Sequence, residues 1–130
     1  MEMVTGLLTR VFNPSASRNA AARDAGNRRA SVDAAVAWWL RSLAGRDGVA
    51  EDALEPFARA LRADLMARLD TTYRVYLEVV HQPKGVLRDA ALATGLDLDA
   101  FPAATTMAVT DVKVEVSKAA AEPYQVLHAA

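Results

Sequence analysis

The sequence predicts an α+β protein: a small two-layer domain with helices on one face of a mostly antiparallel sheet of roughly three to four strands, with an extended N-terminal arm. Two observations indicate this fold class. Apolar residues recur at helical spacing in the first half of the chain, and from Thr71 onward the period shortens to the two-residue alternation of strands. A length of 130 residues suits one compact domain with an arm, and not two domains.

The N-terminal segment, Met1 to Phe12, carries an apolar stripe on one side of a predicted helix. The stripe comprises Met1, Val4, Leu7, Leu8 and Val11, and Phe12 follows it. An apolar stripe of this kind is covered either by its own domain or by a neighbouring chain. These residues are therefore candidate partner-binding residues.

A polar stretch from Asn13 to Ala30 follows and is predicted to be a flexible, basic linker, because it has almost nothing to bury. Its candidate polyanion contacts are Arg18, Arg23, Arg28 and Arg29. A solvated linker is the simpler interpretation, since the stretch lacks aromatic residues that would stack on bases. We therefore divide the chain into an arm, residues 1–30, and a single domain, residues 31–130.

Two helices are expected at the start of the domain. Ser31 is a candidate N-cap for the first, whose apolar residues recur at helical spacing until Gly45, and the second is expected from about Glu51 to Leu69. Neighbouring side chains on a helix point about 100° apart, so Trp38 and Trp39 cannot both face one core. Trp38 is a candidate partner contact, and burial between two elements of the same domain is the alternative.

The strand pattern begins with an alternation whose buried face is predicted to hold Tyr73, Val75, Leu77 and Val79. A short helix is expected next, with Gly95 as its C-terminal stop. Strand chemistry returns from Met107 to Val116, as two strands or as one strand bent near Asp111.

The C-terminal tail is predicted to be either a last edge strand or a second extended arm that starts at about residue 120. Tyr124 and Val126 are candidate partner-binding residues in this tail, because a chain end can reach another subunit.

Composition excludes several classes of site. The chain has no cysteine, so it has no disulfide, no thiolate nucleophile and no Cys-ligated zinc. Glu2 stands where a signal peptide carries positive charge, and no apolar run approaches the roughly 20 residues that span a bilayer. The sequence predicts a cytoplasmic origin and no membrane partner, and incorporation into a virus particle is compatible with both.

Few residues are candidates for catalysis or metal binding. His81 has Glu78, Gln82 and Lys84 nearby, but the third member of a catalytic triad is absent from the local sequence. Asp97 and Asp99 lack the spacing of a calcium loop, and Asp97 is better interpreted as a helix N-cap. Because phosphate-binding glycine motifs are also missing, we expect no enzyme, no metal and no cofactor.

The function predicted from these features is structural: a small non-enzymatic subunit that its terminal arms hold in a larger assembly with itself or with other subunits. A virion component of a tailed bacteriophage, such as a connector, head-completion, cement or tail-accessory protein, is the class that fits this size. A winged-helix-like nucleic-acid-binding or regulatory protein is the alternative, with a recognition helix that would carry Asp97 and Asp99 and a wing from Met107 to Val116. Asp97 and Asp99 count against that alternative, because they would face phosphates.

Overall fold

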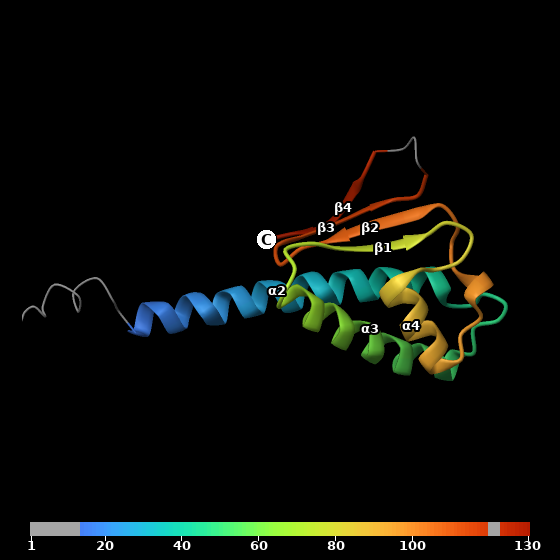
Figure 1. Ribbon diagram of the computed structural model, residues 1–130, viewed down its shortest axis with the longest axis horizontal. Coiled ribbons are helices and arrows are strands. Elements are labelled where there is room, and N and C mark those ends of the chain that lie inside the picture. Colours follow the sequence, from blue (N-terminus) through green and yellow to red (C-terminus); the bar gives the residue numbers. More distant parts are fainter. Residues whose placement is uncertain (1–13, 120–122) are drawn as a thin grey trace, which may run out of the picture.

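The computed structural model describes the backbone of residues 14–119 and 123–130, and the side chains of those ranges from Asp24 onward. It confirms the predicted α+β class (Figure 1). The helices are α2 (Pro14–Leu43), α3 (Leu54–Leu69) and α4 (Gly85–Thr94), and the strands are β1 (Val75–Val79), β2 (Thr105–Val109), β3 (Lys113–Ser117) and β4 (Gln125–Ala129). Two single 3-10 turns lie at Glu51–Ala53 and Leu98–Ala100.

The four strands form an antiparallel sheet in the order β1-β2-β3-β4, so each strand pairs with its neighbour along the chain. Its register is continuous except for one irregularity at Val114 and Glu115, where β3 meets β4. The β2–β3 connection is a short turn, whereas the chain between β1 and β2 contains α4 and the 3-10 turn Leu98–Ala100.

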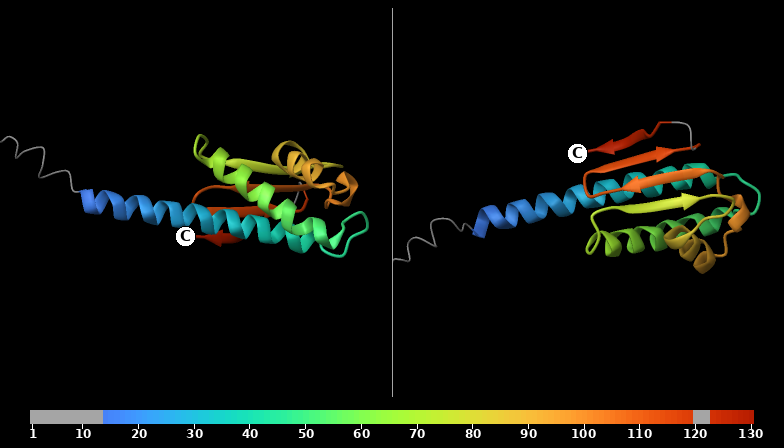
Figure 2. Two further views of the ribbon diagram at one scale, coloured as in Figure 1. Left: turned by 90° about the horizontal axis from the view of Figure 1, so that it is seen from below. Right: turned by 45° about the horizontal axis from the view of Figure 1, so that its top comes forward.

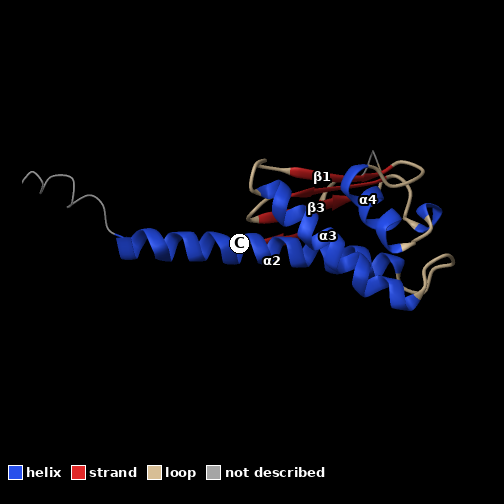
Figure 3. Ribbon diagram, turned by 60° about the horizontal axis from the view of Figure 1, so that its bottom comes forward, coloured by secondary structure: helices blue, strands red, loops and turns tan. Residues whose placement is uncertain are grey.

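All three helices of the described chain lie on one face of this sheet (Figures 1 and 3). α2 contacts β2, β3 and β4, whereas α3 and α4 contact each other and β1. The strands turn alternate side chains toward this helical layer, as the two-residue period predicts. The inward-facing residues include Val75, Leu77, Val79, Met107, Val109, Val114 and Val116, and all are buried.

An aromatic cluster joins the helices to the loop before β2. Trp39 of α2 and Phe57 of α3 both contact Phe101. The ring centroid of Phe101 lies 6.1 Å from that of Trp39 and 5.8 Å from that of Phe57. All three side chains are buried. Large rings contribute the most apolar area per residue, so this cluster anchors the end of the domain where the α2–α3 turn and the Asp97–Phe101 segment meet.

The stretch predicted to be a flexible linker is helical from Pro14 onward, which corrects both the linker and the predicted helix start at Ser31. Alanine and arginine, which are strong helix formers, account for much of residues 14–30, and Pro14 occupies a first-turn position where its missing N–H costs no helical hydrogen bond. Extending an existing helix costs less free energy than starting a new one. The part of α2 from Ser31 onward, which packs in the core, therefore stabilises the preceding helical turns, which bury little surface. The prediction relied on burial alone and therefore missed this extension.

Two predictions about strands also need correction. Tyr73 does not face the core but is 76% exposed, because β1 begins only at Val75. The tail from Gln125 is an edge strand paired with β3, so of the two alternatives for the C-terminus the strand is the observed one.

Two local predictions are confirmed. Gly95 ends α4 in the left-handed conformation, with φ of +78°, and Asp97 accepts a hydrogen bond from the backbone N–H of Asp99 at 2.9 Å. In the described part of the chain, no helix combines the length and the apolar content that crossing a bilayer requires.

Candidate interaction surface

The face of the sheet that points away from the helices is not covered by any element in the described chain (Figure 2). Cross-strand partners lie on the same side of a sheet, so the register places Tyr76, Ala108, Glu115 and Val126 in one row across this face. We call the outward side of the four strands the open sheet face.

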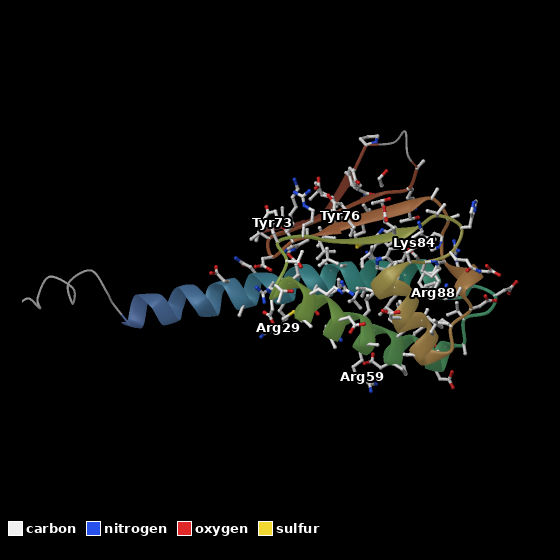
Figure 4. The ribbon with its side chains drawn as sticks, in the orientation of Figure 1. Arg29, Arg59, Tyr73, Tyr76, Lys84 and Arg88 are labelled. Atoms are coloured by element: carbon white, nitrogen blue, oxygen red, sulfur yellow. The ribbon has the colours of Figure 1, made fainter. Side chains whose placement is uncertain are left out.

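Aromatic side chains stand on the β1 side of the open sheet face. The guanidinium carbon of Arg74 lies 5.6 Å from the ring centroid of Tyr73 and 5.9 Å from that of Tyr76, and Arg74 also donates a hydrogen bond to Tyr76 Oη at 2.9 Å. Tyr76 is 52% exposed. Figure 4 shows Tyr73 and Tyr76 at the sheet, whereas Arg29 and Arg59 lie in the helical layer. Exposed tyrosine and arginine side chains held together are typical of protein-binding surfaces.

Small outward-facing residues along β2 line two separate hollows on the open sheet face. Ala104 and Thr106 line a hollow of about 320 Å³, and Ala108 and Thr110 line a second hollow of about 200 Å³. Tyr124 borders the first hollow and Tyr73 the second. We call this pair of hollows along β2, from Ala104 to Thr110, the trough.

Tyr124 and Val126, two of the predicted partner-binding residues, lie on the β4 side of the trough. Both are about half exposed. Val126 pairs with Glu115 in the sheet register, and Tyr124 lines the hollow that also contains Thr106 and Ser117. Apolar side chains thus lie on both sides of the trough, and Arg74, Lys113 and Glu115 also line its second hollow.

Trp38, which was predicted to contact a partner, is only 8% exposed. Its ring packs edge-on against Trp39, with centroids 4.8 Å apart, and Lys118 Nζ lies 5.9 Å from its centroid. The structure thus places Trp38 at the margin of the core, which corresponds to the alternative considered from sequence.

Arg28, a predicted polyanion contact, is occupied within the domain. Its Nε and Nη2 donate to the two carboxylate oxygens of Asp111 at 2.9 and 3.3 Å, and Nη1 pairs with Asp70. The hydrogen bonds to Asp111 raise the pKa of Arg28, which keeps the guanidinium charged. Ser31 Oγ donates to the carbonyl oxygen of Asp111 at 3.0 Å. These contacts fasten α2 to the β2–β3 turn and to the end of α3.

The other predicted polyanion contacts are not brought together with Arg28. Arg29 is exposed on α2. Arg18 and Arg23 lie on the helical backbone of α2, and their side chains are outside the described residues. The six predicted partner-binding residues from Met1 to Phe12 are also outside the described residues.

His81 lines a hollow of about 450 Å³ together with Lys84, Arg88 and Asp99. All four side chains are exposed, and Gln82 Nε2 donates to Asp99 Oδ1 at 2.7 Å. Among the described residues, no group of three or more histidine, aspartate or glutamate side chains has an arrangement that could hold a metal ion. The hollow shows no hydrogen bond between His81 and a neighbouring group that would orient it as a base.

The winged-helix alternative needed a recognition helix after α4. The structure has only a single 3-10 turn there, Leu98–Ala100, before the chain enters β2. One turn of this length cannot present the row of side chains that reads a DNA groove.

Sequence reasoning placed Arg74 and Tyr76 on the wetter side of the predicted strand but did not name Tyr73, Arg74 or Tyr76 as candidate contacts. A usable signal was present, because Arg74 and Tyr76 alternate with the buried valines and leucine of β1. What local sequence could not show is that Ala108 and Thr106 lie beside them, since that depends on the register between β1 and β2.

Comparison with known proteins assigns no family to the chain. No protein-family model matches it, and no curated protein shows significant sequence similarity to it.

Proposed function

We propose that this chain is a non-enzymatic structural protein that assembles with itself or with other subunits through its N-terminal segment, Met1–Phe12. One observation carries the proposal: the N-terminal half of α2 projects from the domain (Figure 1), and the segment that precedes it in sequence bears an apolar stripe. Asp24, Ala25 and Gly26, the first residues of α2 with described side chains, are all exposed. A projecting helix with an apolar segment before it can reach a neighbouring molecule.

A virion component of a tailed bacteriophage is the kind of assembly we favour, with head-completion, connector, cement and tail-accessory roles as its members. Small size and the absence of cysteine are compatible with such a subunit. The open sheet face supports the proposal independently, because several large apolar side chains remain accessible there. A polyanion contact through Arg18, Arg23 and Arg29 is an additional role within the same proposal.

The test compares the full chain with a variant that lacks residues 1–23. This variant keeps Arg28 and Ser31, which fasten α2 to the rest of the domain. Light scattering over a range of concentrations should show an oligomer for the full chain and a monomer for the truncated one. Circular dichroism and a thermal melt of both proteins establish that the truncated domain is folded.

Two outcomes would contradict the proposal. The full chain could remain monomeric at every concentration, which would remove self-assembly. Alternatively, the truncated protein could form the same oligomer, in which case residues 1–23 are not the assembly element.

A further inference from the structure

We propose that the trough on the open sheet face binds the N-terminal segment, Met1–Phe12, of a second copy of this chain. This inference rests on the proposed function and specifies the surface that receives the segment. It combines the dimensions of the trough, the side chains that flank it, and the direction in which α2 leaves the domain.

The dimensions of the trough and of the segment match. From Ala104 to Thr110 the trough is about 20 Å long, at a strand rise of about 3.3 Å per residue. A helix over Met1–Phe12, as the sequence predicts, would be about 18 Å long. The distance from β1 to β3 is two strand spacings, or about 10 Å, which is close to the diameter of one helix.

The floor of the trough suits an apolar stripe, and its margins combine apolar and charged side chains. The floor consists of the small, uncharged side chains of Ala104, Thr106 and Ala108. The larger apolar side chains of the stripe can therefore approach the backbone of β2. On the β1 side, Tyr76 is 52% exposed, Glu78 stands in the same strand and Arg74 directly precedes it. On the β3 side, Lys113 and Glu115 pair with each other at 3.4 Å, and Val126, which is 50% exposed, lies one strand further, on β4. Packing a helix there would cover apolar surface on both partners, which is the main source of free energy in such contacts.

The direction of α2 favours a second copy over the chain's own trough. From Arg28, which is held by Asp111 at the end of the trough, α2 extends to Pro14 on the helical side of the sheet (Figure 2). This part of α2 carries the chain about 21 Å away from that anchor. Only Asn13 separates Phe12 from α2. If the predicted Met1–Phe12 helix turned back at Asn13, its length of about 18 Å would be less than the distance of about 21 Å back to Arg28, so it would not reach the trough of its own chain.

The first experiment uses the full chain with matched substitutions on each side of the proposed contact. On the surface, Tyr76→Arg and Thr106→Arg place charge at the margin and on the floor of the trough, and Leu92→Arg is the control. Leu92 is 56% exposed, similar to Tyr76, but it lies on α4 in the helical layer. In the segment, Leu7→Asp disrupts the stripe, and Thr9→Asp on the polar side is its control.

We expect Tyr76→Arg, Thr106→Arg and Leu7→Asp each to weaken self-association by about 10- to 100-fold in light scattering or sedimentation. Both controls should associate like the unaltered chain. Thermal melts of all five variants identify any substitution that acts by unfolding the domain, and two different trough substitutions keep the test decisive if one does.

A mixing experiment then distinguishes exchange between copies from folding back. Thr106→Arg has an intact segment and a blocked trough, whereas Leu7→Asp has a blocked segment and an intact trough. If the segment binds a second copy, an equimolar mixture should form a mixed dimer at concentrations where each variant alone is monomeric. If the segment binds its own trough, the mixture should stay monomeric, and the inference is overturned.

Failure of this inference is separable from failure of the proposed function. Loss of assembly in Leu7→Asp, with normal assembly in both trough variants, would show that the segment assembles on a different surface. That result overturns the trough as the binding site and leaves the proposed function intact. A monomeric full chain would overturn both.

Discussion

At the scale of single residues, Gly48 shows how one missing side chain fixes the approach of two loops. Its φ is +81°, and a Cβ atom added there would lie 2.7 Å from Asp97 Cβ and 2.8 Å from Asp97 Oδ2. The Gly48 carbonyl oxygen also accepts a hydrogen bond from the Asp97 backbone N–H at 3.2 Å. Gly45 has a similar φ of +79° but no atom within 4 Å of such a Cβ, so it is a matched control.

We predict that Gly48→Ala lowers the free energy of unfolding more than Gly45→Ala. Gly45→Ala should cost about 1 kcal/mol, for the left-handed backbone alone. Gly48→Ala should cost at least about 1 kcal/mol more, because the Asp97 side chain and its loop must also move. Urea denaturation of both variants measures the difference, and equal losses would mean that the loop adapts freely.

The environment of a site residue was predictable when its contacts are close in sequence, and it was not predictable when they are distant in sequence. Asp97 was correctly identified as a cap because its partner, Asp99, is two residues away. Trp38 was considered as a surface residue because the sequence does not show how Trp39 and Lys118 enclose it. Arg28 was included among free arginines because its acceptors, Asp70 and Asp111, are 42 and 83 residues away in sequence.

At the scale of elements, α2 is the main difference between prediction and structure. The second helix and the strand alternation were predictable because burial imprints a period on the sequence. The extension of α2 to Pro14 leaves no apolar period, and intrinsic helix propensity with the attachment at Arg28 accounts for it. The open sheet face depends on pairing among four strands, which a single sequence does not specify.

The attachment of α2 leads to a prediction about Arg28 and its neighbour. Arg28→Ala should lower the free energy of unfolding by about 1–2 kcal/mol, because two carboxylates lose a shared cation at a partly exposed site. Arg29→Ala is the control, since Arg29 is exposed and makes no ion pair in the described part of the chain, and it should change stability by less than about 0.5 kcal/mol.

Thermal or urea unfolding of the two arginine variants provides the measurement. Arg28→Lys adds a stricter comparison, because an ammonium group cannot make the forked contact with Asp111 while also reaching Asp70. A lysine variant as stable as the unaltered protein would contradict the bridging role of Arg28.

At the scale of the whole molecule, charge and apolar surface point to different modes of assembly. The net charge is −1, and Arg28, one of the four candidate polyanion contacts, is paired internally. The open sheet face, by contrast, exposes Tyr73, Tyr76, Tyr124 and Val126. An assembly that depends on the apolar surface should respond to salt differently from one that depends on phosphate contacts.

We therefore predict that self-association stays within about threefold, or strengthens, as salt rises from about 0.05 M to about 0.5 M. Apolar burial is insensitive to screening, and salts excluded from the protein surface favour it. Binding through arginine–phosphate contacts would instead weaken by orders of magnitude over the same range. Sedimentation across this range, beside a titration with random duplex DNA, separates the two modes. Two results would contradict this prediction. One is a steep loss of self-association as salt rises, and the other is salt-sensitive DNA binding of the full chain that disappears when residues 1–23 are removed. Either result would assign the N-terminal region to an anionic partner and not to the trough of a second copy.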